Sequence, residues 1–276
     1  MSTIELLVPT VNDFDASDFD RLFGLWSDCQ GAGRDVTLNF SRCSFLRQNA
    51  VAFLGGLIRL VEHRGGRARV DWSTLRPDVG RNLAKNGFRD IFGERTDHGL
   101  GETIPYREDR EADKEALMDY LKNLWLGREW VSVSSALRDA IVGVVYEIYA
   151  NAFEHAESPI GLFSCGQHFW NRKELRLTVV DFGIGIPANV RRFASNDTLS
   201  ADKTMEWAFM AGTTTKPNGM GRGMGLDLLR EFVRAYPNRR ALPIAPGHDG
   251  VPRGTRDDAK EDRERGAVPG QVADSR

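Results

Sequence analysis

The sequence predicts an α/β fold, because segments with the period of a strand and segments with the period of a helix alternate along most of the chain. The composition agrees, since 41% of the 276 residues are hydrophobic and 28% are charged, as in ordinary globular proteins. A chain of this length can bury either one large core or two modest ones. The order of the segments favours two domains separated by a polar linker.

The first 95 residues are predicted to form a small α/β domain. Residues 35–40 alternate apolar and polar side chains, as a half-buried strand does, and residues 67–72 are typical of a second strand. Helices are expected at 49–63, where apolar residues recur at helical spacing, and at 77–86, which starts with a proline and is followed by a glycine. Strand, helix, strand and helix in this order indicate a layered α/β domain over residues 1–95.

Residues 96–112 are predicted to be a solvated linker. They are polar, contain two glycines and a proline, and end in a run of charges. After them, helical periodicity predicts helices at 114–126 and 135–156. Two strands are then expected at 161–168 and 174–180, joined by a short polar turn.

The last part of the chain carries weaker signals. Residues 187–220 show no sustained period and contain glycine and proline, so a mobile loop is expected. A helix at 226–235 closes a second domain, 113–236. Residues 237–276 are rich in proline, glycine and mixed charges, and we expect this tail to be disordered, because it cannot bury enough apolar surface to offset its ordering entropy.

Charge, cysteine and histidine content exclude several classes of protein. The formal net charge of -2 gives no reason to expect nucleic acid or an anionic membrane as a partner. The three cysteines are widely spaced and the five histidines form no HExxH-like cluster, which argues against a disulfide framework and a transition-metal site. No signal peptide is recognisable, and no apolar stretch reaches the roughly 18 residues that span a bilayer. We therefore expect a cytoplasmic protein.

The first motif that carries chemistry lies on the helix 135–156. Glu147 and Asn151 stand at positions i and i+4, so their side chains meet at the border of an apolar stripe. A carboxylate there can orient a water or hydroxyl for attack, and an amide oxygen beside it can ligate Mg²⁺. The alternative is a solvated polar edge of the helix. The stripe, expected to pack on a sheet, consists of Ile141, Val145, Ile148 and Ala152.

The second motif follows the predicted strand 174–180. Asp181 closes this strand and begins a turn that contains Gly183 and Gly185. A carboxylate at a strand end can accept a hydrogen bond from the amino group of adenine, and glycines let the backbone approach the ring. The alternative is an ordinary Asp-Gly turn.

The third motif is a glycine-rich segment that precedes an amphipathic helix. Gly221, Gly223 and Gly225 would expose backbone N–H groups and the positive end of the helix dipole to phosphate. A dinucleotide-binding GxGxxG needs a strand directly before it, and residues 212–218 do not form one. A GxxxxGK[ST] loop is also absent from the sequence. Two common nucleotide folds are therefore disfavoured.

These three motifs, in this order, resemble those of the GHKL superfamily of histidine kinases, type II topoisomerases and mismatch-repair ATPases. Glu147-x-x-x-Asn151 resembles its N box, and Asp181-x-Gly183-x-Gly185 its adenine-binding G1 box. Gly221-x-Gly223-x-Gly225 resembles its phosphate-binding G2 box, and the segment around residues 212–216 its ATP lid. The resemblance covers about residues 115–236 and implies a Bergerat-type α+β two-layer sandwich that binds ATP with Mg²⁺.

The resemblance also implies residue roles. Glu147 would be the base that activates water or accepts a proton, Asn151 the Mg²⁺ ligand and Asp181 the adenine reader. Lys216 and Arg222 would be cations near the phosphates, with solvated lid charges as the alternative. Two departures stand out: helix 114–126 has no histidine to act as phosphoacceptor, and the family's further strands after the G2 helix are missing, since the chain runs into its polar tail.

The first half is similar to the STAS domain of anti-anti-sigma factors. The strand near residue 38, the following turn and the helix to residue 63 all correspond. The family's Asp-Ser-Ser-Gly turn is replaced by residues 47–50, and Asn49 takes the position of the phosphorylated serine. The resemblance therefore implies a docking or regulatory module that is not itself a substrate. A regulatory protein partner is expected, and homodimer formation is left open.

Two functions of different classes follow from these resemblances. In the first, the chain is an enzyme that moves the γ-phosphate of ATP to water or to a serine of a partner protein. In the second, it is a non-catalytic, nucleotide-gated interaction module. The presence of Glu147 favours the enzyme, because nucleotide binding alone needs no base, while the missing C-terminal strands favour the module.

Overall fold

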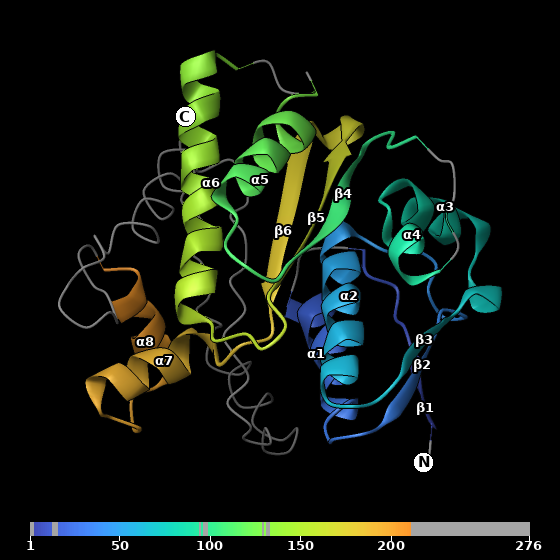
Figure 1. Cartoon of the computed structure of the whole chain (residues 1–276), viewed down its shortest axis with the longest axis horizontal. Coiled ribbons are helices and arrows are strands. Elements are labelled where there is room, and N and C mark those ends of the chain that lie inside the picture. Colours follow the sequence, from blue (N-terminus) through green and yellow to red (C-terminus); the bar gives the residue numbers. More distant parts are fainter. Residues whose placement is uncertain are drawn as a thin grey trace, which may run out of the picture.

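The computed structural model describes residues 3–12, 16–93, 95, 99–128, 130 and 133–210. Two three-stranded sheets and the helices around them make up this part of the chain (Figure 1). The elements are β1 (Thr3–Leu7), α1 (Ala16–Asp28), β2 (Asp35–Asn39), α2 (Gln48–His63), β3 (Ala68–Asp71), η1 (Trp72–Thr74), α3 (Pro77–Lys85), α4 (Phe88–Phe92), β4 (Thr103–Asp109), α5 (Lys114–Asp119), η2 (Tyr120–Trp125), α6 (Ser135–His155), β5 (Leu162–Phe169), η3 (Trp170–Arg172), β6 (Glu174–Asp181), α7 (Gly185–Ala194) and α8 (Ala201–Ala208).

The first sheet is parallel, in the order β1-β2-β3. Its central strand β2 buries Val36 and Leu38, as its alternating pattern predicts. The predicted strands 35–40 and 67–72 and the predicted helices 49–63 and 77–86 are confirmed to within two residues as β2, β3, α2 and α3. The mixed helix and strand content confirms the α/β class.

The second sheet is antiparallel, in the order β4-β5-β6. Strands β5 and β6 were predicted, but β4 lies within residues 96–112, so the prediction of a solvated linker there is wrong. The run of charges suggested a solvated loop, but two of these charges pair within the strand. Arg107 donates to the carboxylate of Asp109 at 2.7 Å, and Asp109 is buried. The same strand buries Ile104 and Tyr106.

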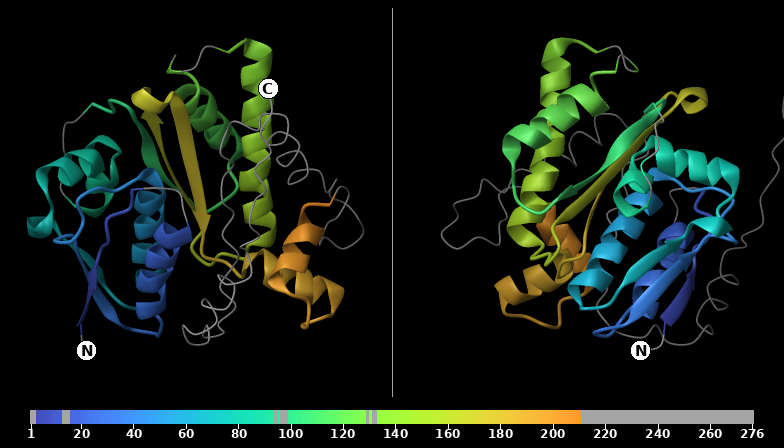
Figure 2. Two further views of the ribbon diagram at one scale, coloured as in Figure 1. Left: turned by 180° about the vertical axis from the view of Figure 1, so that it is seen from behind. Right: turned by 45° about the vertical axis from the view of Figure 1, so that its right-hand side comes forward.

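Helices cover both faces of the second sheet (Figure 2). Helices α5 and α6, with the π-helical turn η2 that continues α5, pack on one face, where Ile104, Leu162 and Leu177 point. Helix α2 from the first half packs on the other face, where Phe163 and Cys165 point. Alternate residues of β5 therefore belong to two different cores, as the period of a strand requires.

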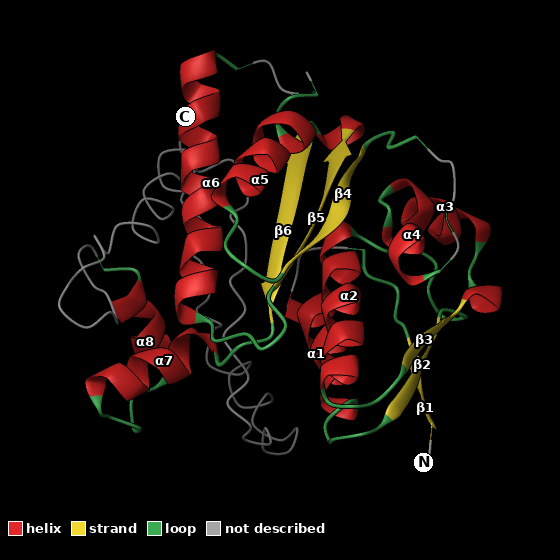
Figure 3. Cartoon of the chain, in the orientation of Figure 1, coloured by secondary structure: helices red, strands yellow, loops and turns green. Residues whose placement is uncertain are grey.

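Helix α2 lies between the two sheets, so the two halves of the chain pack directly on each other (Figure 3). Two neighbouring glycines of α2 make this close approach. A Cβ on Gly55 would overlap the hydroxyl of Tyr106, and a Cβ on Gly56 would overlap the ring of Phe182 and lie 2.7 Å from Phe163. An ion pair crosses the same interface, from Arg59 to Glu108 at 3.0 Å.

Two helices occupy part of the segment 187–220, which the sequence predicted to be a loop. Helix α7 begins at Gly185, and α8 begins after Ser200, whose side chain accepts a hydrogen bond from the backbone N–H of Lys203. The rings of Phe193 and Trp207 pack α7 on α8 with centroids 5.5 Å apart. The loop prediction is therefore wrong for these residues, because each helix is too short to show a sustained period.

Several predictions fall outside the described residues. They concern the end of the predicted loop, the helix at 226–235 and the disorder of residues 237–276. Within the described ranges, none of the helices combines the length and the apolar character needed to cross a membrane.

Candidate functional site

Helix α6 carries the first motif and is anchored on the second sheet. Its N-cap Ser134 accepts a hydrogen bond from the N–H of Leu137 at 3.2 Å. Val142 and Tyr149 are its fully buried residues, and the Tyr149 hydroxyl lies 2.7 Å from the hydroxyl of Ser164 on β5. Ile141, Val145 and Ala152 of the predicted stripe pack partly buried against this core, whereas Ile148, its fourth member, is not part of the cluster, so the stripe is confirmed for three of its four residues.

Glu147 and Asn151 lie at the edge of that packed face. The Glu147 side chain is exposed and Asn151 is half-buried. Four residues of helix separate them by about 6 Å along the axis, and their side chains share one side of the helix. A solvated carboxylate and a partly sheltered amide oxygen are thus available next to each other, as a base and a Mg²⁺ ligand would need to be.

Asp181 is the last residue of β6, at the edge of the sheet where the strand ends. Its carboxylate accepts a hydrogen bond from the N–H of Gly183 at 2.9 Å. The surrounding protein raises the pKa of this carboxyl above its ordinary value, although the residue reaches the surface, and the bond from Gly183 opposes part of that rise. Asp181 therefore lies at the end of the strand, as predicted, and its use as an acceptor for adenine stays a prediction.

The turn after Asp181 is fixed to the end of α6. The N–H of Ile184 donates to the carbonyl of Ala156, the residue that ends α6, at 2.8 Å. A Cβ on Gly183 would overlap that same carbonyl, and Gly185 has a φ of 77°, so both positions favour glycine for different reasons. A second link runs from the amide of Asn189 to the carbonyl of His155 at 2.9 Å.

This junction brings the first two motifs to one edge of the sheet. Asn151 stands five residues before Ala156, which is about 7.5 Å along the helix axis. Glu147, Asn151 and Asp181 therefore lie on elements whose C-terminal ends meet at Ala156. The remaining predicted site residues lie outside the described residues, and they are Lys216, Gly221, Arg222, Gly223 and Gly225.

Phe182, between Asp181 and Gly183, is a residue that sequence reasoning missed. Its ring packs against Phe53 of α2 with centroids 5.4 Å apart and against Phe163 at 6.1 Å. It also lies directly over Gly56. The Gly55-Gly56 pair inside a predicted helix was the available signal, since adjacent glycines weaken a helix unless something packs closely there.

Comparison with known proteins agrees with this arrangement. Residues 136–256 match the family model described as histidine kinase-, DNA gyrase B-, and HSP90-like ATPase. The match spans all three motifs and ends at residue 256, beyond the predicted domain boundary at 236. Neither the curated proteins nor the solved structures include a significant match to the chain. The GHKL resemblance is thus confirmed, the STAS resemblance of the first half stays a prediction, and residues 136–256 are similar to the histidine kinase-, DNA gyrase B-, and HSP90-like ATPases.

Proposed function

We propose that this chain binds ATP with Mg²⁺ where α6 and β6 end, and that it hydrolyses the nucleotide or transfers its γ-phosphate. The observation that carries the proposal is the junction at Ala156, which ties the helix of Glu147 and Asn151 to the turn after Asp181. The similarity of residues 136–256 to ATPases supports it. An edge fixed in this way suits a ligand that is recognised at one end, by Asp181, and reacts at the other, beside Glu147 and Asn151.

Each of the three polar residues has a distinct role in this proposal. Asp181 accepts a hydrogen bond from the adenine amino group. Asn151 provides an oxygen ligand to Mg²⁺, which prefers hard oxygen donors. Glu147, exposed at the edge of α6, orients the attacking water or accepts the proton of a hydroxyl.

The phosphate-binding part of the proposal rests on the sequence. Backbone N–H groups near Gly221, Gly223 and Gly225 would hold the phosphates at the start of a helix. Lys216 and Arg222 would add positive charge beside them. The proposed cofactors are accordingly ATP and Mg²⁺.

The binding step is tested by titrating MgATP into wild type and Asp181→Asn. Loss of a charged acceptor for the adenine amino group should weaken binding by about 1.5–3 kcal/mol. Asp28→Asn is the matched control, since Asp28 is an exposed aspartate at the end of α1 and is not one of the predicted site residues. If Asp181→Asn binds MgATP as tightly as the control, the adenine assignment is wrong.

A second function, a nucleotide-gated interaction module, is favoured by the contact of Phe182 with α2. Nucleotide held by Asp181 would bear directly on the residue that packs against Phe53 and Gly56 of the first half. In that case ATP would change how the first half meets a regulatory protein, with little chemistry. The two functions differ in turnover, which the Glu147 variants described in the Discussion measure.

The first half is proposed to be a docking module for that regulatory protein. Asn49, which takes the phosphoacceptor position of the STAS resemblance, is only 2% exposed at the start of α2. Because an amide is not phosphorylated as a serine is, and because this one is buried, regulation by phosphate at this position is disfavoured. A radiolabelled ATP assay with this chain and candidate partners would identify any acceptor on the partner.

A further inference from the structure

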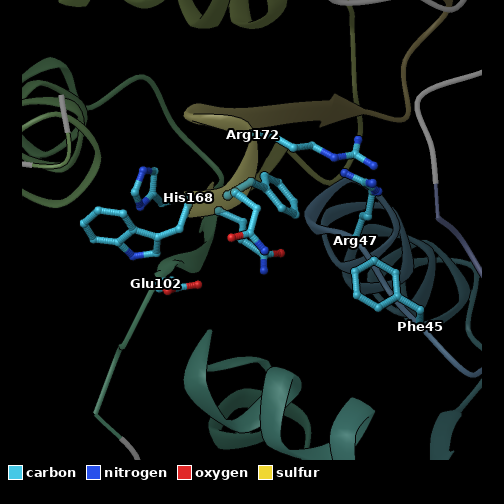
Figure 4. A pocket seen from close by; sticks show the side chains of 9 residues that line it. Phe45, Arg47, Glu102, His168 and Arg172 are labelled. Carbon is cyan, nitrogen blue, oxygen red and sulfur yellow. The ribbon is translucent and has the colours of Figure 1, made fainter.

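A pocket lies at the opposite end of β6 from Asp181. Its volume is about 430 Å³, within the usual range for small-molecule sites. The turn between β5 and β6 forms one wall, and residues just before α2 form another, so both halves of the chain contribute (Figure 4). The length of β6 separates this pocket from Asp181 by about 20 Å.

Two guanidinium groups define one end of the pocket. Arg47 is 4% exposed and is held in place, because its Nε donates to the carbonyl of Asn12 and its guanidinium lies 4.9 Å from the ring centroid of Phe169. Arg172, on η3, is exposed, and Figure 4 shows its guanidinium end pointing toward that of Arg47. Two like charges that converge favour an anion between them.

The start of α2 adds further donors at the same end. Arg47 is the N-cap of this 16-residue helix and provides no side-chain capping bond, so the first backbone N–H groups of α2 lack that partner. The next two side chains, Gln48 and Asn49, are both 2% exposed. Of their polar atoms, the Nδ2 of Asn49 is a buried donor with no hydrogen-bond partner in the described part of the chain, whereas the unpaired Oε1 of Gln48 and Oδ1 of Asn49 are acceptors, and neither residue lines the pocket itself.

Aromatic side chains line the other end. His168 is 3% exposed and stacks on Trp130 with ring centroids 4.9 Å apart, and its ring also meets Trp170 at 4.8 Å. The Nδ1 of His168 is buried without a hydrogen-bond partner among the described residues. Trp170 itself is 60% exposed, which leaves much of an indole open to a ligand.

The remaining charge of the pocket fixes the orientation of a ligand. Glu102 lies on the side of His168, away from the two arginines (Figure 4), and its carbonyl accepts the backbone N–H of His168 at 2.9 Å. Its carboxylate disfavours an anionic group at the aromatic end. Negative charge is therefore favoured at the arginine end and a flat, apolar group beside Trp170.

We propose that this pocket binds a small organic anion, a phosphate or a carboxylate attached to an aromatic ring. The anionic group lies between Arg47 and Arg172 at the start of α2, and the ring lies along Trp170. This site is separate from the proposed nucleotide site, and its ligand contacts both halves of the chain at once.

The proposal is tested by calorimetric titration of the full chain with phenyl phosphate and with benzoate, in the presence of saturating MgADP. Saturable binding of either compound is expected, and which of them binds identifies the anionic group. Inorganic phosphate has only the anionic group and phenol has only the aromatic ring, so each should bind at least about tenfold more weakly. MgADP occupies the proposed nucleotide site, so binding that persists belongs elsewhere.

Two exposed variants locate the binding. Arg172→Gln should weaken the binding of the aromatic anion about tenfold or more, because it removes a charge-assisted contact. Trp170→Ala should weaken the binding of phenyl phosphate and leave the affinity for inorganic phosphate unchanged. Arg69→Gln, an exposed arginine on β3 that does not line the pocket, is the control and should bind as wild type does.

Two results would overturn the proposal. One is the absence of saturable binding of both anions at roughly 1 mM, the weakest affinity expected of a built site. The other is equal affinity of Arg172→Gln and Arg69→Gln. Neither result depends on whether ADP binds, so failure of this site and failure of the proposed function can be told apart.

Discussion

At the scale of single residues, Asp181 keeps a carboxyl group where the fold disfavours its charge. The surrounding protein raises the pKa of this group, and the N–H of Gly183 offsets only part of the rise. The folded state therefore holds the proton more tightly than the unfolded state. Stability contributed by this group falls as the pH rises from its unfolded pKa through its raised folded pKa.

Asp181→Asn should accordingly raise the melting temperature at neutral pH, though only slightly, because solvent screens the charge of this exposed residue. The gain should shrink as the pH falls through the raised folded pKa and should be lost below about 4, where the carboxyl is protonated in both states. Thermal melts over this pH range would measure it, with Asp197→Asn as the control for loss of one exposed negative charge. A variant that is less stable than wild type at neutral pH would contradict the raised pKa.

Glu147 and Asn151 are adjacent on α6 and should nevertheless respond differently to substitution. Glu147→Ala should keep MgATP affinity and lose turnover by roughly 10²–10⁴-fold, because a base acts on the reaction and hardly on binding. Asn151→Ala should instead weaken binding that depends on Mg²⁺. Steady-state ATPase rates and MgATP titrations separate the two effects, with Glu115→Gln on α5 as the control. Hydrolysis at the wild-type rate by Glu147→Ala would remove its assigned role and favour the non-catalytic module.

At the scale of elements, α2 shows how packing overrides helix propensity. Alanine is about 1 kcal/mol better than glycine inside a helix, so a glycine pair there needs a packing reason. Phe182 and Phe163 provide it at Gly56, because both rings occupy the space of a Cβ. The close approach of α2 to the second sheet depends on that missing side chain.

Gly56→Ala should therefore destabilise the protein by about 1–3 kcal/mol, as overpacking does. Gly24→Ala offers a matched comparison, since Gly24 lies in α1 with open space where a Cβ would be. That variant should gain about 0.5–1 kcal/mol from helix propensity and a stiffer unfolded chain. Chemical denaturation of both variants measures the difference. If Gly56→Ala and Gly24→Ala changed the stability in the same direction, the inference of a tight contact at Gly56 would be wrong.

At the scale of the whole molecule, the two halves share one helix, and we expect them to unfold together. Helix α2 is part of the core of the first sheet and also covers a face of the second. The Arg59–Glu108 ion pair, with both side chains at most 25% exposed, adds a polar contact across this interface. If either half unfolded alone, the apolar surface of the other half that packs against it would be exposed to water.

Thermal unfolding should thus show a single transition with the same midpoint by far-ultraviolet circular dichroism and by tryptophan fluorescence. MgADP should raise that one midpoint, since a ligand of the folded state stabilises everything that unfolds with it. Two transitions, with only the second shifted by MgADP, would show that the halves are independent. Phe182→Ala should then bring the protein closer to that behaviour by weakening the contact with α2.

Much of the local structure could be predicted, because it depends on neighbours in sequence. Periodicity located α2, α6, β5 and β6 and placed Asp181 at a strand end. The strand β4 was missed, because its charges are paired within the strand, and α7 and α8 were missed, because each is too short for a period to show. Local periodicity also carries no information about which residues far apart in the chain contact each other.

The sequence by itself determined the order of the motifs and hence the similarity to a family of ATPases, since motif spacing is a local property. Only the tertiary structure decided that the carbonyl of Ala156 fixes the turn after Asp181, and that Phe182 rests on α2. Such contacts arise when elements distant in sequence compete for the same apolar surface, and that competition is settled by shape and volume in three dimensions. The separate pocket between Arg47 and Arg172 has the same origin, because its walls come from residues more than a hundred positions apart.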